Sequence, residues 1–178
     1  MKHIPITVNS TLVVDGAIRV RKERLRYHNE HEQDYFIIAS SSQSVSVIAV
    51  SANNELLVTR EYRHAIGKYV IGFAGGLVDE AETPLDAARR ELLEETGCTA
   101  SSFEVLGSCY PLPGILAQKM TIVLARDAIV THVPSLEPSE NIQTSFMSKD
   151  ALIQLIQEGA DVDGVMCTTL AFYNLQLS

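Results

Sequence analysis

The sequence predicts a mixed α+β or α/β fold in which helices pack on a β-sheet. Two observations support this prediction. Short β-rich runs fill the first half of the chain, and helical patterns occur in the middle and at the C-terminal end. The chain has 178 residues, of which 46% are hydrophobic and 20% are charged. This length and composition favour one domain, or one domain with a small appendage, and allow a sizeable core.

The expected strands of the first half are separated by turn residues. They read AIRVRKERLRY (17–27), DYFIIAS (34–40), SVSVIAV (44–50), ELLVTREY (55–62) and KYVIGF (68–73). Turn signals stand at Asp15-Gly16, at residues 40–42 and at Asn53-Asn54. Because Asn53-Asn54 lies between two apolar runs, we expect a hairpin there.

A helix is predicted over residues 83–96. Thr83 suits the N-cap, Pro84 the first helical position, and Asp86 the place of a capping acid. Gly97 is a natural C-terminal stop. The apolar stripe of this helix consists of Leu85, Ala88 and Leu92.

The rest of the chain continues with strands and then helices. Strands are expected at FEVLGSCY (103–110), KMTIVLARD (119–127) and TSFM (144–147), and helices at KDALIQLIQEG (149–159) and GVMCTTLAFYNLQ (164–176). The polar segment 132–143 reads as a loop.

Carboxylates gather on one face of the predicted central helix. Glu91, Glu94 and Glu95 lie at helical spacing, where like charges repel one another. Arg90 precedes Glu94 by four residues and can pair with it. A divalent cation would offset the repulsion, and oxygen ligands without a neighbouring His or Cys favour Mg²⁺ or Mn²⁺ over zinc. The alternative is a plain acidic helix face exposed to solvent.

The spacing of these residues resembles the Nudix box, G-x5-E-x7-R-E-U-x-E-E-x-G-U, in which U is aliphatic. Gly76 and Glu82 begin the pattern and residues 90–98 complete it, with Cys98 departing at the last aliphatic position. The resemblance extends over roughly residues 45–175. It implies a Nudix-type α/β/α sandwich with a mixed sheet, and we expect a small N-terminal antiparallel β-sheet beside it.

The resemblance also implies a set of site residues. The metal ligands would be Gly75 (through its carbonyl), Glu82, Glu91, Glu94 and Glu95. Glu94 and Glu95 would also be catalytic, and Arg90 would orient the glutamates. A general base would come from the loop 132–143, where Glu140 is favoured over Glu137 because it directly precedes Asn141-Ile142-Gln143. The alternative for both acids is a solvated loop.

The segment before the box looks like that of ADP-ribose pyrophosphatases, which usually read Q-Y-R and then E-L-P-A-G. Tyr62-Arg63 match, but Glu61 replaces the glutamine and residues 72–76 read GFAGG. The resemblance implies that Arg63 contacts the diphosphate; the alternative is a surface residue at the end of a strand. Pro113 and Gly114 resemble the substrate-binding S-P-G of that subgroup, although they also form a good turn.

Composition limits the partners. A net charge of −8 without a long basic run argues against nucleic acid, and the absence of a long apolar run argues against a membrane span. The three cysteines, with no CxxC pair, suit a reduced, cytoplasmic protein. We expect residues 1–42 to form an N-terminal β region and residues 43–178 the hydrolase domain. By resemblance, the first region would form a homodimer.

Together these features predict a metal-dependent hydrolase. It would cleave the diphosphate linkage of a nucleoside diphosphate derivative, ADP-ribose or a related nucleotide sugar, to a nucleoside monophosphate and a sugar phosphate. One alternative is a GDP-mannose-type nucleotide-sugar hydrolase. Another is a nucleotide-binding regulatory module with little turnover.

Overall fold

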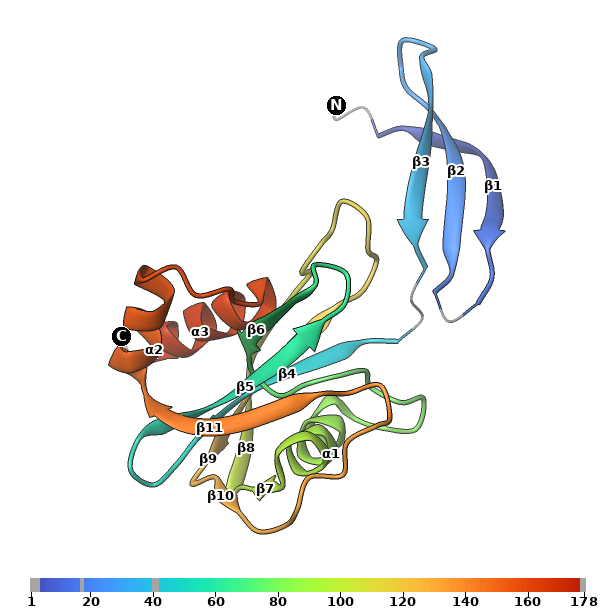
Figure 1. Ribbon diagram of the computed structural model, residues 1–178. Helices are drawn as coiled ribbons and strands as arrows, with labels where there is room; N and C mark the ends of the chain where they lie inside the picture. Colours follow the sequence, from blue (N-terminus) through green and yellow to red (C-terminus); the bar gives the residue numbers. More distant parts are fainter. Residues whose placement is uncertain (1–3, 17, 40–41, 177–178) are drawn as a thin grey trace. The chain divides into compact units, whose positions relative to one another are not determined.

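The computed structural model describes residues 4–16, 18–39 and 42–176 (Figure 1). The strands are β1 (Ile6–Val14), β2 (Val20–Arg26), β3 (Glu32–Ile38), β4 (Ser44–Val50), β5 (Glu55–Arg63), β6 (Lys68–Gly72), β7 (Cys98–Thr99), β8 (Ser102–Cys109), β9 (Met120–Arg126), β10 (Ile129–Val130) and β11 (Ile142–Ser148). The helices are α1 (Pro84–Thr96), α2 (Lys149–Gln157) and α3 (Gly164–Gln176). The chain divides into two compact units. The first ends before Ser42 and includes Tyr110–Lys119, and the second contains the rest.

The first unit is built on an antiparallel sheet. Within its described residues, β1, β2 and β3 form three strands in that order. Asp34 on β3 forms ion pairs with Lys22 at 2.7 Å and with Arg24 at 2.9 Å, both of which lie on β2. The segment Tyr110–Lys119 joins β3, where Ile38 donates its N–H to the Ile115 carbonyl at 2.7 Å. The sequence prediction had placed this segment with residues 43–178.

The second unit contains a mixed sheet. Its described strands run in the order β11-β5-β4-β9-β8, with β6 also paired to β5. The β4–β9 pair is parallel, and the other pairs are antiparallel. The predicted hairpin between β4 and β5 is confirmed: Ser51 donates its N–H to the Glu55 carbonyl at 2.9 Å, and Asn54 has a φ of 61°.

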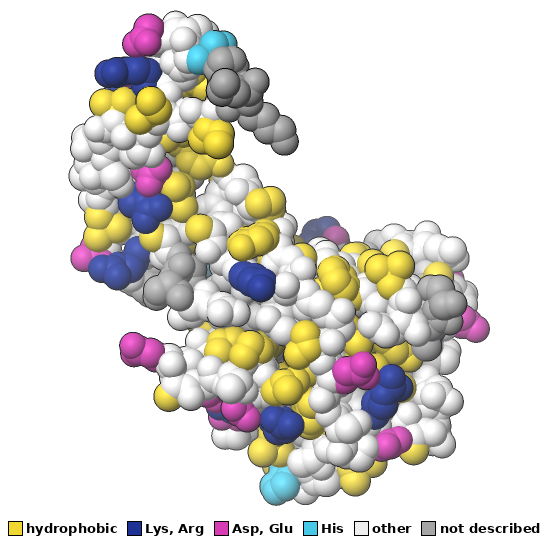
Figure 2. Space-filling model, turned by 180° about the vertical axis from the view of Figure 1, so that it is seen from behind, with side chains coloured by type: hydrophobic (Ala, Val, Ile, Leu, Met, Phe, Trp, Pro, Cys, Tyr) yellow, Lys and Arg dark blue, Asp and Glu magenta, His cyan; other side chains and the backbone are white. Residues whose placement is uncertain are grey.

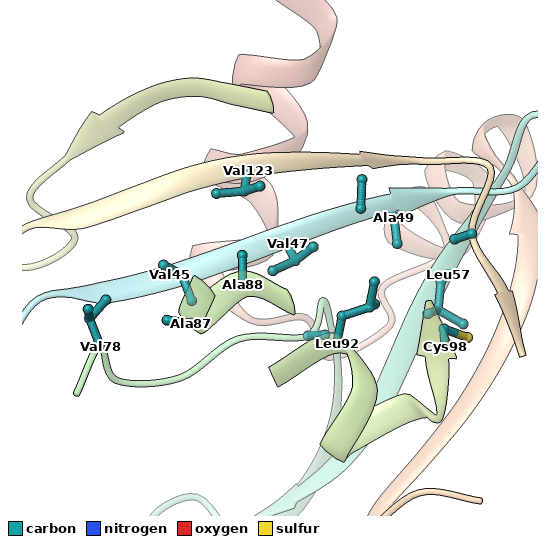
Figure 3. Close-up of a cluster of buried hydrophobic side chains, with 13 residues drawn as sticks. Val45, Val47, Ala49, Leu57, Val78, Ala87, Ala88, Leu92, Cys98 and Val123 are labelled. Atoms are coloured by element: carbon teal, nitrogen blue, oxygen red, sulfur yellow. The ribbon is translucent and has the colours of Figure 1, made fainter. Parts of the chain in front are cut away.

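Helices cover both faces of this sheet, which makes three layers (Figure 1). Helix α1 packs on one face, where Leu92, Ala87 and Ala88 join β4 and β9 residues in a buried cluster (Figure 3). Helices α2 and α3 cover the other face, where Leu152 and Met166 pack with Ile48. The predicted α/β/α sandwich with a mixed sheet is therefore confirmed.

Three strands were not predicted from the sequence. All nine residues of β1 are exposed. Ile6, Val8, Leu12 and Val14 stand at alternate positions of this strand, a signal that sequence reasoning missed. Strands β7 and β10 are two residues long and pair only with each other within the described structure. None of the described helices combines the length and apolar character needed to cross a bilayer.

Candidate functional site

Helix α1 begins and ends as the sequence predicts. The Thr83 hydroxyl accepts the Asp86 N–H at 3.2 Å, and Asp86 accepts the Thr83 N–H at 3.4 Å, which forms a capping box with Pro84 behind it. At the other end Gly97 is left-handed and donates its N–H to the Leu93 carbonyl at 2.8 Å. These contacts fix where the helix begins and ends.

Two glycines before the helix allow close packing, Gly76 against the Glu91 carboxylate and Gly75 against the backbone of β4. A Cβ at Gly76 would lie 2.2 Å from Glu91 Oε1, so only glycine lets this carboxylate approach the loop. Gly75 has a φ of +156°, and a Cβ there would meet the Val45 carbonyl at 2.2 Å. On β4, the N–H groups of Val47 and Val45 donate hydrogen bonds to the carbonyls of Ala74 and Gly76. Gly75, which lies between these two residues, lines a cavity.

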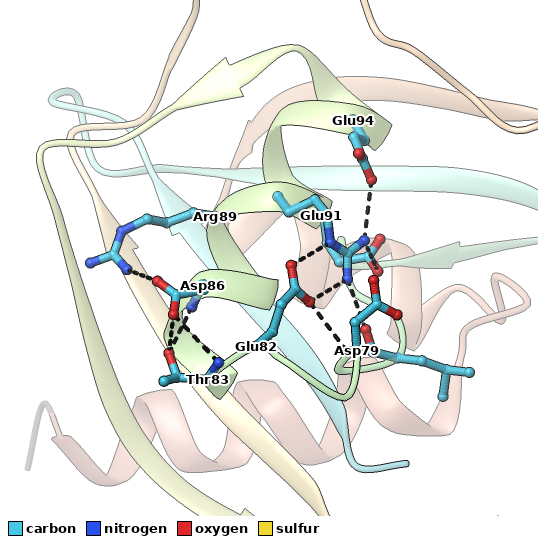
Figure 4. Close-up of polar contacts among 9 residues, drawn as sticks. Asp79, Glu82, Thr83, Asp86, Arg89, Glu91 and Glu94 are labelled. Carbon is cyan, nitrogen blue, oxygen red and sulfur yellow. Dashed lines mark hydrogen bonds and ion pairs between the residues drawn. The ribbon is translucent and has the colours of Figure 1, made fainter.

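Arg90 donates a fan of hydrogen bonds. Figure 4 labels three of the acceptors, Glu82, Glu91 and Glu94. The guanidinium holds both oxygens of Glu82, at 2.8 and 2.9 Å, and also contacts Glu91 at 2.9 Å and Glu94 at 3.2 Å. A further bond reaches the Leu77 carbonyl at 2.9 Å. The predicted pairing of Arg90 with Glu94 is confirmed. The contacts lower the pKa of Glu82 and raise that of Arg90.

Two of the helix carboxylates are buried. Glu91 is 9% exposed and Glu95 is 8% exposed, whereas the Glu94 side chain is 48% exposed. Burial raises the pKa of Glu95 to about 8, although the Gly75 N–H donates to this carboxylate at 2.9 Å. Burial also raises the pKa of Glu91, against the effect of Arg90. Repulsion among the site's carboxylates adds to both shifts.

These side chains face a cavity of about 360 Å³. Other lining residues come from the loop before α1 and from the loop between β10 and β11, which brings Ser135, Glu137 and Glu140 to the site. Glu140 accepts the Glu137 N–H at 2.8 Å, and both carboxylates reach the cavity. The structure therefore brings both predicted candidates for the general base beside the helix carboxylates.

Backbone bonds tie this loop to the C-terminal end of α1. The Gly97 carbonyl accepts the N–H groups of Thr131 at 2.9 Å and His132 at 3.0 Å. Ser135 donates its N–H to the Glu94 carbonyl at 2.8 Å. Carbonyls that a helix end leaves unpaired are thus satisfied by the same loop that carries the two acids.

Arg63 lies at the end of β5. It pairs with Glu61 at 2.6 Å and with Asp163 at 3.7 Å, and its side chain is 51% exposed. Strand alternation places Arg63 and Glu61 on the same face as Leu57, which belongs to the core under α1. Pro113 and Gly114 belong to the first unit, where the Gly114 carbonyl accepts the Tyr35 hydroxyl.

The donor set suits a hard divalent cation. The cavity is lined by Asp and Glu oxygens and by the Gly75 backbone, and Arg90 is the one cationic side chain among the described lining residues. Gly76 leaves space for the Glu91 carboxylate beside the loop. The described residues nevertheless contain no three His, Cys, Asp or Glu groups already gathered around one point. Arg90 holds Glu91, and Gly75 holds Glu95.

Sequence reasoning missed three polar contributors. Asp79 and Ser135 line the cavity, and Asp163 reaches Arg63 across 100 positions of sequence. Asp79 stands inside the box at a position that the motif leaves open, so its spacing gave no signal. Asp163 is placed by tertiary pairing alone, because its N–H bonds to the Ile71 carbonyl of β6 at 2.8 Å.

Known proteins share this pattern and this fold. A family model described as the NUDIX domain matches residues 41–167. The chain is 30% identical over 128 residues to the ADP compounds hydrolase NudE of Escherichia coli (strain K12), covering 72% of this chain and 69% of that protein. It is 24% identical over 135 residues to the ADP-ribose pyrophosphatase of Bacillus subtilis (strain 168), covering 75% and 72%.

A solved structure agrees with the architecture. The crystal structure of an ADP compounds hydrolase superimposes with a TM-score of 0.85 at 23% identity, over 97% of this chain and 94% of that one. This likeness shows that the two proteins share a fold. Together with the family match over residues 41–167, it establishes that the chain belongs to the NUDIX domain family and is a Nudix hydrolase.

Proposed function

We propose that this chain hydrolyses the diphosphate linkage of a nucleoside diphosphate derivative, ADP-ribose or a related nucleotide sugar, with Mg²⁺ or Mn²⁺. The observation that carries the proposal is the pair of buried carboxylates, Glu91 and Glu95, facing a cavity with a single cationic side chain among its described lining residues. Such a cavity repels a diphosphate until cations enter it. The names of the two relatives, an ADP compounds hydrolase and an ADP-ribose pyrophosphatase, favour an adenosine nucleotide.

The proposed ligands are Glu91, Glu95, Glu94 and the Gly75 carbonyl, with Glu82 as an outer ligand. A divalent ion held there supplies positive charge to the diphosphate and acidifies a water molecule. Arg90 keeps Glu91 and Glu94 in place through its fan of bonds.

The other proposed roles concern the substrate and the proton. Arg63 donates hydrogen bonds to the diphosphate and stabilises its negative charge. Glu140 accepts a proton from the attacking water. Its carboxylate is held by the Glu137 N–H, and its charge acts on Glu61, Glu91 and Glu95, so it lies within electrostatic reach of the site.

The first unit is proposed to join two copies of the chain as a homodimer. Figure 2 shows apolar side chains gathered over this sheet, with basic side chains among them. Ile6, Val8 and Leu12 of β1 are 69%, 46% and 43% exposed. Apolar residues on an open sheet are usually covered by a partner.

The test is turnover of a substrate panel with Mg²⁺ and with Mn²⁺. The panel contains ADP-ribose, GDP-mannose, other nucleotide sugars, dinucleoside polyphosphates and nucleoside triphosphates, and phosphate is measured after coupling to a phosphatase. We expect metal-dependent turnover of ADP-ribose or a related nucleotide sugar. The Glu95→Gln variant should lose it by about a thousandfold or more, as when a group that stabilises the transition state is removed.

The exposed Glu104→Gln variant is the control, because Glu104 lies on β8 and its side chain is 57% exposed. Preferential turnover of GDP-mannose would favour the alternative, a GDP-mannose-type nucleotide-sugar hydrolase. Binding of ADP-ribose without turnover of any panel member would replace the proposal with a regulatory binding module.

A further inference from the structure

The Glu61 carboxyl lies beside Arg63, where burial disfavours its ionised form. Burial raises the pKa of the Glu61 carboxyl, Arg63 lowers it, and the charges of Glu140 and Asp163 raise it again. The Glu61 side chain is 16% exposed. Among these neighbours Arg63 is the group that favours the ionised form, through a contact of 2.6 Å. The geometry therefore couples Glu61 to Arg63.

The backbone around this pair is firmly held. Glu61 lies opposite Val70 of β6 and opposite Ile142 of β11, so its strand is paired on both sides. Asp163 donates its N–H to the Ile71 carbonyl at 2.8 Å, and its side chain accepts the Val165 N–H at 2.8 Å. The backbone of Glu61 and the carboxylate of Asp163 are thus both held in place.

Arg63 itself has a long side chain that is half exposed. An exposed arginine side chain loses rotamer entropy when it is ordered. An ion pair that already orders Arg63 in the free protein lowers the entropy lost when the substrate binds. One nitrogen of the guanidinium contacts Glu61 and another contacts Asp163 at a longer distance.

We propose that Glu61 is a positioning residue that orders the Arg63 guanidinium for the diphosphate, with Asp163 as a weaker second support. This inference rests on the proposed function, because it takes the diphosphate as the group that Arg63 binds. Glu61 acts through Arg63 and does not itself touch the substrate.

The experiment measures KM and kcat for ADP-ribose in Glu61→Gln, Arg63→Ala and the double variant. Glu61→Gln keeps the size of the side chain and removes its charge. We expect it to raise KM roughly fivefold, equivalent to about 1 kcal/mol, with little change in kcat. Arg63→Ala should raise KM further, and adding Glu61→Gln to it should have no additional effect. Asp163→Asn should have a smaller effect, since its contact with Arg63 is 3.7 Å.

Glu104→Gln is the matched control, because it removes a carboxylate that faces Arg126 at 3.7 Å on the exposed surface. Thermal unfolding of each variant checks that it folds. A second readout is calorimetric binding of ADP with Mg²⁺, which needs no turnover and should weaken in Glu61→Gln only while Arg63 is present.

The outcomes separate the two proposals. A raised KM in Arg63→Ala with an unchanged KM in Glu61→Gln overturns the role of Glu61 and leaves the proposed function standing. An effect of Glu61→Gln that persists in the Arg63→Ala background also overturns it, because Glu61 would then act by another route. Unchanged KM and ADP binding in Arg63→Ala would show that Arg63 does not bind the diphosphate. That result would overturn both the proposed role of Arg63 and the proposed role of Glu61.

Discussion

No described residue of the first unit is buried, whereas the second unit contains two buried apolar clusters, one on each face of its sheet. The first unit is held by strand pairing and by ion pairs such as Lys22–Asp34. The second can hold carboxylates out of water because a packed core fixes the helix that carries them. The difference indicates that the arrangement of the helix carboxylates depends on the second unit's core, whereas association is the role we propose for the first unit.

The largest effect on stability should come from the core under α1. Leu92 is fully buried there, so Leu92→Ala should lower the free energy of unfolding by about 3 kcal/mol through lost contacts and a cavity. Urea unfolding followed by circular dichroism measures this. A loss below about 1 kcal/mol would mean that the cluster relaxes around the gap and that the contrast between the units is weaker than described.

A second test uses the buried charge. The pKa of Glu95 is about 8 in the folded protein against 4.5 ordinarily, so between these values the folded state holds a proton that the unfolded state releases. The metal-free protein should therefore lose stability as pH rises from about 4.5 through about 8. Unfolding in chelator at several pH values should show this slope in the wild type and a shallower one in Glu95→Gln. Equal slopes would contradict it.

The first unit should respond to pH in the opposite sense. The hydrogen bond from Lys22 lowers the pKa of Asp34, so the stability it contributes is present above its ordinary pKa of 3.8 and is lost as pH falls through the lowered value. Amide signals of β2 and β3 in NMR spectra should change at acid pH before those of β4 and β9. Asp34→Asn is the control, and it should remove the acid sensitivity of these two strands.

The smallest expected effect on stability lies on β1. Leu12 is 43% exposed, so Leu12→Ala should change the free energy of unfolding of the monomer by less than about 0.5 kcal/mol. Leu12→Glu should still shift a homodimer toward monomers in sedimentation velocity, because it places a charge on the proposed interface. A wild-type chain that is monomeric at all concentrations would remove this role from the first unit.

Much of the second unit could be predicted because its signals are local. The caps of α1 depend on Thr83, Asp86 and Gly97, which lie within or beside the helix. The hairpin at Asn53-Asn54 is likewise a short-range feature. The two-residue strands β7 and β10 could not be predicted, because two residues are too few to show a hydrophobic period.

The sequence predicts which residues form the candidate site. It predicts less well how buried each of them is and which contacts it makes. The spacing of the box indicates that Glu91, Glu94 and Glu95 share a region of the helix. It does not indicate that Glu94 is half exposed while the other two are buried, because that depends on how α1 rolls on the sheet. The bonds from Arg90 to Glu82 and to the Leu77 carbonyl depend on the path of the loop before the helix.

The bonds between the loop and the end of α1 have a consequence for local opening. Thr131, His132 and Ser135 donate their amides to the Gly97 and Glu94 carbonyls, so the loop cannot detach without leaving the last turn of the helix unpaired. The two segments should behave as one cooperative unit in native-state hydrogen exchange. The amides of these three residues would then exchange with the same free energy as those of the last turn of α1, and Glu140 and Glu95 would leave the site together.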